Sequence, residues 1–225
     1  IEHSNALTCV GRKDTFGYDG ALNTGASLVS EPVLNRAGMV QISPANTGTV
    51  LTSPTHRAAQ EPLTASGTIK TVTYFRVVTT DALQGPADAA FMNSKLHIKK
   101  YFLVDDKLAY GAGLAASMDA YATQKLGMTK VGVGHIDPTD SASISTSSDA
   151  VADEVVSKNP DAVFCGCDTE ASVAFPKDLR NKGFKNRFVA GDAFFTQDWI
   201  DKVGSATTNS FASSVGPDPL ATSKS

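Results

Sequence analysis

The sequence has no hydrophobic run long enough to cross a membrane and no strong excess of either charge. A membrane-spanning helix needs about 20 consecutive apolar residues, and no such run is present. The 20 basic and 23 acidic residues leave a formal charge of −3, which offers no positive field for nucleic acid or for an anionic membrane surface. The first residues lack the charged-then-apolar order of a signal peptide, so any export signal would lie upstream. We therefore expect no nucleic-acid partner.

Cysteine and histidine are too few and too scattered to suggest a metal site. The three cysteines, Cys9, Cys165 and Cys167, lack metal-binding spacing, and no two of the four histidines lie four residues apart. A bridge between Cys165 and Cys167 would close a very tight, strained ring. We therefore interpret the cysteines as unpaired small residues of the core or of loops, and we predict no metal.

The sequence motifs of common α/β enzymes are also missing. There is no Gly-x-Ser-x-Gly elbow, no phosphate-binding loop and no dinucleotide fingerprint, of which Gly111 and Gly113 supply only half. We therefore predict neither catalysis nor a cofactor. An α/β enzyme that uses Asp105 or Asp106, which follow an apolar run, is retained as a minor alternative.

The sequence does contain a repeated plan of short apolar runs followed by amphipathic stretches. This alternation predicts an α/β fold in which parallel strands are buried on both faces. Thr169 is a candidate N-cap for the last predicted helix, and Pro176 inside that helix has no local explanation. The predicted strands are residues 101–104, 131–133, 162–165 and 187–189, and the predicted helices are residues 110–126, 148–159 and 169–182.

The first part of the chain shows the same plan once more. We predict a helix at 26–36, a strand at 39–43, a long polar loop at 53–70 and a strand at 72–78, and we assign no element before Ala21. A further helix begins after Thr80, and we expect its apolar face to consist of Leu83, Ala87, Ala90 and Phe91. We therefore divide the chain into residues 1–80, 81–214 and a crossover or tail at 215–225.

Polar residues follow the predicted strands, where open α/β sheets bind their ligands. They are the run from Ser43 to Thr47, Asp105 and Asp106 with Tyr110, Asp168 with Thr169, and Asp192. Hydroxyls, helix-start amides and carboxylates suit a zwitterion, because they offer donors for its carboxylate and an acidic partner for its ammonium. The alternative is that these residues only cap the following helices.

Several motifs resemble those of ABC-importer substrate-binding proteins of the branched-chain amino-acid class. The resemblance covers about residues 18–216 and keeps the order of the family's motifs. The motifs include GALNTGAS at 20–27, PVLNRAG at 32–38, ISPANT at 42–47, YFRVV at 74–78, VDDK at 104–107, PDAVF at 160–164 and DLR at 178–180.

This resemblance implies a two-lobed type I periplasmic-binding-protein fold, with parallel sheets flanked by helices, that closes on a small ligand. Residues 1–80 would form a partial first lobe, 81–214 the second lobe, and the family usually continues on both sides of this region. A first lobe without its opening strands would expose its sheet centre and would not fold alone. The implied protein is a periplasmic or other extracytoplasmic monomer, with a lipid anchor as one form, that delivers an amino acid or similar solute to a membrane permease. A ligand-sensing regulator of the same fold is the alternative.

The resemblance also assigns roles to residues. Thr24, Ala45 and Thr47 match the carboxylate-binding set, and Asn46 joins the predicted ligand-binding residues as part of the same run. Thr24, Ala45 and Thr47 are therefore expected to bind the carboxylate end of the ligand.

Three residues of the second lobe complete the predicted site. Tyr110 matches an aromatic residue that lines the cleft, and Asp192 matches the acidic partner of the ligand ammonium. Asp168 stands where amino-acid binders often have an aromatic residue. This departure favours a more cationic or more hydroxylated ligand.

Overall fold

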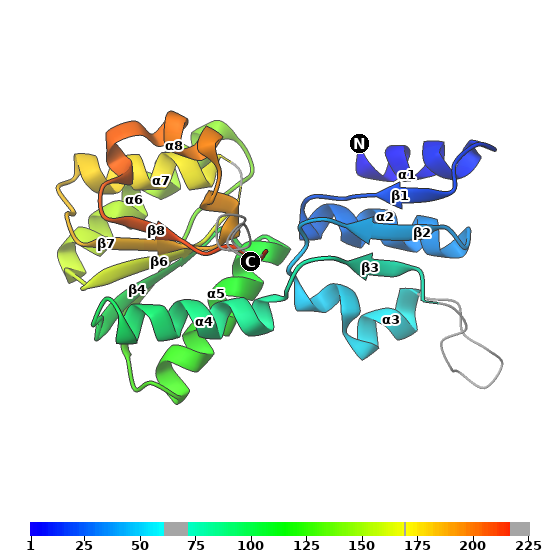
Figure 1. Cartoon of the computed structure of the whole chain (residues 1–225). Coiled ribbons are helices and arrows are strands. Elements are labelled where there is room, and N and C mark those ends of the chain that lie inside the picture. The colour runs from blue at the N-terminus through cyan, green and yellow to red at the C-terminus, as the bar shows by residue number, and fades with distance from the viewer. Residues whose placement is uncertain (61–71, 169, 217–225) are drawn as a thin grey trace, which may run out of the picture. The chain divides into compact units, whose positions relative to one another are not determined.

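The computed structural model describes residues 1–60, 72–168 and 170–216 (Figure 1). The chain divides into two compact units, Ile1–Thr80 and Asp81–Ser225, and each is described by itself. Among the described helices, none combines the length and the apolar character that crossing a membrane requires.

The second unit is built on a parallel sheet of five strands in the order β5-β4-β6-β7-β8. Every residue of β6 is buried, and so is every residue of β4 after Lys100, which explains why both segments are continuous apolar runs in the sequence. The prediction of a parallel α/β sheet is confirmed, although β8 was not predicted. The strands are β4 (Lys100–Asp105), β5 (Thr129–His135), β6 (Ala162–Gly166), β7 (Arg187–Ala190) and β8 (Ser210–Ala212).

Helices cover both faces of this sheet, with α4 and α5 on one face and α6, α7 and α8 on the other (Figure 1). Side chains along β4 alternate accordingly, because Tyr101 and Leu103 join one apolar cluster while Phe102 and Val104 join the other. The helices are α4 (Asp81–Ser94), α5 (Ala109–Gln124), α6 (Ser141–Lys158), α7 (Ala171–Asn181) and α8 (Gln197–Val203), with short 3-10 turns η2 (Asp192–Phe194) and η3 (Gly204–Thr207).

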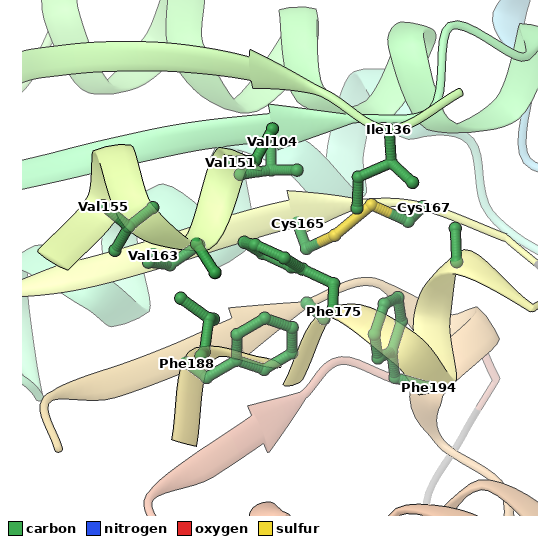
Figure 2. Packing of buried hydrophobic residues seen from close by; sticks show 14 of the residues in the cluster. Val104, Ile136, Val151, Val155, Val163, Cys165, Cys167, Phe175, Phe188 and Phe194 are labelled. Atoms are coloured by element: carbon green, nitrogen blue, oxygen red, sulfur yellow. A yellow bond between two sulfur atoms is a disulfide. The ribbon is translucent and has the colours of Figure 1, made fainter. Parts of the chain in front are cut away.

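Cys165 and Cys167 form a disulfide in the larger of these clusters, which corrects the prediction that they are unpaired (Figure 2). Alternate residues of an extended strand point to the same side, so both thiols enter the core beside Phe175 and Ile136. The two Cα atoms lie 5.5 Å apart, inside the ordinary range for a bridge. The predicted burial of both residues is confirmed.

Pro176 lies inside α7 without ending it, and the tertiary structure explains why it is tolerated. Proline has no N–H to donate to the carbonyl four residues earlier, which belongs to Ser172. The indole Nε1 of Trp199 on α8 donates to that carbonyl at 2.8 Å. The indole therefore satisfies the acceptor that the proline leaves open.

The buried face of α4 differs from the predicted one. Leu83 is 69% exposed and Phe91 is 37% exposed, so the expected apolar face is wrong. The face that packs inward carries polar residues as well as Ala89 and Met92. Hydrophobic periodicity fails here because Gln84 and Asp88 point inward and form hydrogen bonds with other elements of the unit. The buried polar residues of this helix are Asp81, Gln84 and Asp88.

Two predicted helix starts in the second unit also change. Helix α6 begins earlier than predicted, at Ser141, where the side chain of Asp140 accepts a hydrogen bond from the backbone N–H of Ser143. The start of α7 is at Ala171, and the predicted N-cap Thr169 lies outside the described residues.

The first unit holds a three-stranded parallel sheet in the order β1-β2-β3. Two elements precede Ala21, where none was predicted. Helix α3 occupies the start of the predicted polar loop, because Ser53 Oγ accepts from the backbone of His56 and Pro54 fits a first helical turn. The rest of that loop lies outside the described residues. The elements are α1 (Glu2–Gly11), β1 (Gly17–Asp19), α2 (Thr24–Arg36), β2 (Val40–Ser43), η1 (Thr49–Thr52), α3 (Pro54–Gln60) and β3 (Tyr74–Arg76).

The two faces of this smaller sheet differ in character. Gln41 and Tyr74 are paired in register and buried, and Gln41 Nε2 donates to Ser27 and Ser30 of α2. Ile42 and the neighbouring Phe75 share the other face and are 42% and 46% exposed. One face of the sheet is therefore held by polar contacts, while the other presents apolar side chains to solvent.

Candidate functional site

Tyr110 and Asp192 meet beyond the carboxyl end of the second unit's sheet. Tyr110 lies in the first turn of α5, and Asp192 opens the 3-10 turn η2 directly after β7. The Tyr110 hydroxyl donates to Asp192 Oδ1 at 2.8 Å. Gly191 makes this approach possible, since a Cβ there would lie 2.4 Å from the tyrosine oxygen. The structure therefore brings two of the predicted ligand-binding residues into direct contact.

A chain of hydrogen bonds extends from Asp192 to α4 and to the segment after β8. Gln84 Nε2 donates to Asp192 Oδ1 at 2.8 Å and to Ser213 Oγ at 2.9 Å. The Ser213 hydroxyl in turn donates to Asp88 Oδ2 at 3.3 Å. Segments that are distant in the sequence thus hold Asp192 in one orientation.

Burial and the charge of Asp192 together raise the pKa of two groups in this region, Tyr110 and Asp88. Burial, and then the charge of Asp192, raises the pKa of Tyr110 well above its usual range, so the phenol stays protonated as a donor. The pKa of Asp88 is raised to about 7. Burial is the largest cause, the Ser213 hydrogen bond acts in the opposite direction, and the charge of Asp192 adds to the rise. An environment of this kind favours a cationic group over an anionic one.

Asp168 lies after β6 and is held by a different partner. Its backbone N–H donates to Asp106 Oδ2 at 2.7 Å, and Asp106 Oδ1 accepts from the backbone of Leu108 at 3.0 Å. Burial raises the pKa of Asp106 to about 6, although these two backbone hydrogen bonds lower it. Asp106 is fully buried and joins two loops. Asp168 is partly exposed, and no hydrogen bond described here joins its side chain to Tyr110 or Asp192.

In the first unit, Thr24 lies against the loop that follows β2. Thr24 is the first residue of α2, and its Oγ1 accepts from the backbone N–H of Gly48 at 3.3 Å. A Cβ at Gly48 would lie 2.4 Å from Thr24 Cγ2, so this contact requires the glycine. Thr47, the preceding residue of the loop, is fully buried, and its Oγ1 has no hydrogen-bond partner among the described residues.

Asn46 and Ala45 complete the predicted set, and both are tied to the scaffold. The Asn46 carboxamide oxygen accepts from Ser27 and from Tyr74, and its nitrogen donates to the carbonyl of Leu22 at 2.7 Å. The backbone N–H groups of both Ala45 and Asn46 point to Ser43 Oγ. Asn46 therefore has a structural role that the sequence prediction did not anticipate. Thr47 keeps an available hydroxyl.

Gln84, Asp88 and Ser213 form one hydrogen-bonded cluster with Asp192, and the sequence prediction did not include them. Gln84 and Asp88 lie on the helix whose buried face was assigned wrongly, and Ser213 follows the strand that was not predicted. The one available signal was the acidic and amide residues of α4, spaced three and four positions apart at 81, 84 and 88, which place them on one helix face.

A family model described as "Periplasmic binding protein" matches residues 4–224 of this chain. No curated protein matches it in sequence. Solved structures with the same fold include the branched-chain amino acid transporter substrate binding protein LivJ from Streptococcus pneumoniae in complex with isoleucine. That match has 18% identity and a TM-score of 0.74, and covers 99% of this chain and 59% of the other.

Two further solved structures are similar at comparable levels. The leucine binding protein LivK from Thermotoga maritima has 20% identity and a TM-score of 0.73, with coverage of 92% of this chain and 53% of the other. A solute binding protein of an ABC transporter from Rhodopseudomonas palustris, in complex with 3,4-dihydroxy benzoic acid, has 16% identity, a TM-score of 0.70, and coverage of 92% and 51%. The chain thus spans between half and three fifths of the length of these structures.

Proposed function

The chain belongs to the periplasmic binding protein family, and we propose that it is an extracytoplasmic solute-binding protein that captures an amino acid or a similar small polar ligand for an ABC importer. The observation that carries the proposal is the Tyr110–Asp192 pair at the carboxyl end of the second unit's sheet, the edge at which open α/β sheets bind ligands. We assign residues 1–80 to the first lobe and 81–214 to the second.

Asp192 has the properties of a partner for a ligand ammonium. Tyr110 and Gln84 both donate to its Oδ1, which fixes the carboxylate and leaves Oδ2 without a hydrogen-bond partner among the described residues. A carboxylate oriented in this way forms a charge-assisted hydrogen bond, about twice as strong as a neutral one. Asp192 would therefore bind the positive end of the ligand.

The loop after β2 offers donors for the negative end of the ligand. The buried Thr47 hydroxyl has no hydrogen-bond partner among the described residues, and a buried group of this kind is stabilised when it acquires one. Thr24 and Ala45 lie in the same unit and complete the assigned carboxylate set, with the Ala45 N–H already directed to Ser43 Oγ. Asn46 would hold this loop in place through its side-chain hydrogen bonds to Ser27 and Tyr74.

Similar structures support this ligand class. LivJ is solved with isoleucine, and LivK is described as a leucine binding protein. The R. palustris protein is solved with an aromatic acid that has no ammonium. The Asp192 carboxylate favours an amine-bearing ligand for this chain over a purely anionic one. Asp168 would add a further acidic contact.

The Cys165–Cys167 disulfide supports a location outside the cytoplasm. Disulfides persist in oxidising compartments such as the periplasm and are rare where glutathione keeps thiols reduced. This observation agrees with an exported binding protein, whether free or lipid-anchored. We propose a monomer that delivers its ligand to a membrane permease, and a ligand-sensing regulator of the same fold would differ only in its downstream partner.

The enzyme alternative has less support. Asp106 is fully buried and both of its carboxylate oxygens accept backbone N–H groups. Asp105 Oδ1 accepts from the backbone of Lys107 and contacts His135 Nδ1 at 2.8 Å. Both residues therefore serve as loop caps, and we propose that the protein carries out no catalysis.

The test is a binding measurement on Asp192→Asn with a matched control. The full natural protein is screened by thermal shift against L-amino acids, small amides, polyols and aromatic acids, because a ligand that binds the folded state raises its melting temperature. The affinity of each amine-bearing hit is then measured by calorimetry for the wild type, for Asp192→Asn and for Asp198→Asn. Asp198 is an exposed carboxylate on α8 that pairs only with Lys202 in the described residues.

We expect Asp192→Asn to weaken binding of an amine-bearing ligand about 30-fold or more, because it removes a charge partner from a desolvated contact. Asp198→Asn should leave the affinity unchanged. If the two variants bind equally well, Asp192 does not hold the ammonium. If the wild type binds only ligands without an amine, the proposed ligand class is wrong.

A further inference from the structure

Gln84 is held in one amide orientation by its neighbours. Its Nε2 donates both of its hydrogens, one to Asp192 Oδ1 at 2.8 Å and one to Ser213 Oγ at 2.9 Å. Ser213 uses its own hydrogen toward Asp88, so its oxygen is an acceptor for Gln84. The reverse amide orientation would turn the Gln84 carbonyl toward the Asp192 carboxylate, where two acceptors repel each other.

The same arrangement leaves the other end of the Gln84 amide unused. Gln84 is 3% exposed, and its Oε1 has no hydrogen-bond partner among the described residues. A buried carbonyl oxygen without a donor costs free energy, and such groups in native proteins call for an explanation. Since the amide cannot turn, Oε1 can be satisfied only by a donor that comes from outside this network.

The chemistry around Oε1 restricts what that donor can be. Asp192 Oδ1 lies 2.8 Å from Gln84 Nε2, and Asp192 Oδ2 has no hydrogen-bond partner among the described residues. The charge of Asp192 raises the pKa of both Tyr110 and Asp88, and the charge of Asp81 raises that of Tyr110. Two acceptors in a negative field match a donor that is positively charged and carries more than one hydrogen. A primary ammonium meets both requirements, whereas a hydroxyl lacks the charge and a quaternary ammonium lacks the hydrogens.

We propose that Gln84 is a specificity-determining residue that orients Asp192 through its amide nitrogen and accepts a hydrogen bond from the primary ammonium of the ligand through its amide oxygen. This inference rests on the proposed function and deepens it, because it names the form of amine that the site selects. It predicts discrimination between a ligand with an amino group and the same ligand without one, beyond the contribution of Asp192 alone.

The experiment compares ligand pairs on Gln84→Met. The probes are L-isoleucine, L-leucine and L-phenylalanine, each paired with the carboxylic acid that lacks its amino group and with its N,N,N-trimethyl derivative, and affinities are measured by calorimetry. Methionine has a similar length to glutamine and keeps no amide. Gln84→Asn retains an amide that is one methylene too short to reach Asp192 and Ser213, and it serves as the second variant if Gln84→Met fails to fold.

The matched control is Gln197→Met. Gln197 on α8 also donates through Nε2 to an aspartate, Asp201, at 2.8 Å, but at an exposed position. The control therefore makes the same substitution in the same kind of Gln–Asp contact, away from the proposed site.

We expect Gln84→Met to lower the preference for the primary amine over its deaminated partner by about 10- to 100-fold, the range for a hydrogen bond to a charged group. Gln197→Met should leave it unchanged. A folded Gln84 variant with the wild-type preference would overturn the role of Gln84 while leaving the proposed function intact. A wild-type protein that binds none of the amine-bearing probes, or that binds the trimethyl forms equally well, would overturn the ammonium site itself and Gln84's role with it.

Discussion

Both units alternate parallel strands with helices, but the second unit has a larger sheet and larger described apolar clusters than the first. In the second unit, helices cover both faces of a five-stranded sheet, and two large apolar clusters flank it. In the first unit, the described apolar cluster is small, with Ala6, Val33 and Leu34 as its buried members. Its sheet turns Ile42 and Phe75 toward solvent. Parallel sheets are stable when both faces are covered, so this difference concerns stability directly.

The comparison teaches that packing and function are distributed differently in the two units. The second unit holds a proline in α7, whose open carbonyl Trp199 satisfies, and buried carboxyl groups beside Gln84, next to a large apolar core. The first unit holds its sheet to α2 through Gln41 and serine hydroxyls instead. Polar contacts of this kind give orientation but little net stability, since water competes for the same groups.

The largest expected effect is on autonomous folding. Residues 81–225, expressed alone, should unfold cooperatively with a free energy of about 5 kcal/mol or more, because their core is self-contained. Residues 1–80 alone should show no cooperative transition. Circular dichroism during thermal and urea unfolding measures both fragments against the whole chain. A cooperative melt for residues 1–80 would break the comparison.

The next effect concerns one substitution made in each unit. Phe188→Ala removes a side chain that is 1% exposed in the second unit, and we expect a loss of about 3–5 kcal/mol from cavity formation. Phe75→Ala removes one that is 46% exposed in the first unit, and we expect less than about 1 kcal/mol. Urea unfolding of both variants gives the two values. A large loss for Phe75→Ala would mean that the exposed sheet face is covered in the whole protein.

A smaller effect is expected on the pH dependence of stability, because the second unit holds a buried carboxyl group, Asp88, with a raised pKa. The folded-state pKa of Asp88 is raised by burial from 3.8 to about 7, so the folded form binds its proton more tightly than the unfolded form. The stability of the second unit should therefore fall as pH rises from about 4 to about 7 and then level off. Asp88→Asn should remove the part of this decline above about pH 6, because the raised pKa of Asp106, about 6, leaves a decline of its own below that pH. The substitution should stabilise the protein at pH 8 by about 1–4 kcal/mol. Asp19→Asn, an exposed substitution in the first unit, is the control and should leave the pH dependence unchanged. A decline above about pH 6 that persists in Asp88→Asn would assign it to another group.

Much of the second unit could be predicted from the sequence because its signals are local. Apolar runs such as 101–104 and 162–165 are strands buried on both faces, and Gly183, with φ of +88°, directly follows the C-cap of α7, as predicted. Helix α5 ends at Gln124, slightly before the predicted stop at Gly127. The family resemblance agrees with the matching family model and with the fold of the solved structures. Signals of this kind depend on residues a few positions apart and need no knowledge of distant contacts.

The prediction failed where a residue's environment comes from far along the chain. The face of α4 could not be found from periodicity, because the partners of Gln84 lie at Asp192 and Ser213, more than 100 positions away. The structural role of Asn46 was also not predicted, because Ser27 and Tyr74, which donate to its amide oxygen, lie 19 and 28 positions away. Strand-end position made Tyr110 and Asp192 candidate site residues, but their hydrogen bond could be seen only in the tertiary structure.

The sequence by itself determined the class of this protein, because hydrophobic period, glycine stops and strand-end polar residues are written in short segments of chain. Only the tertiary structure decided how the polar groups are used. It paired Cys165 with Cys167 by pointing both to one side of a strand, and it supplied Trp199 to the carbonyl that Pro176 leaves open. It also oriented the Gln84 amide so that Nε2 donates to Asp192, while Oε1 has no hydrogen-bond partner among the described residues. The physical reason is that a hydrogen bond depends on distance and direction in space, which residue order does not specify.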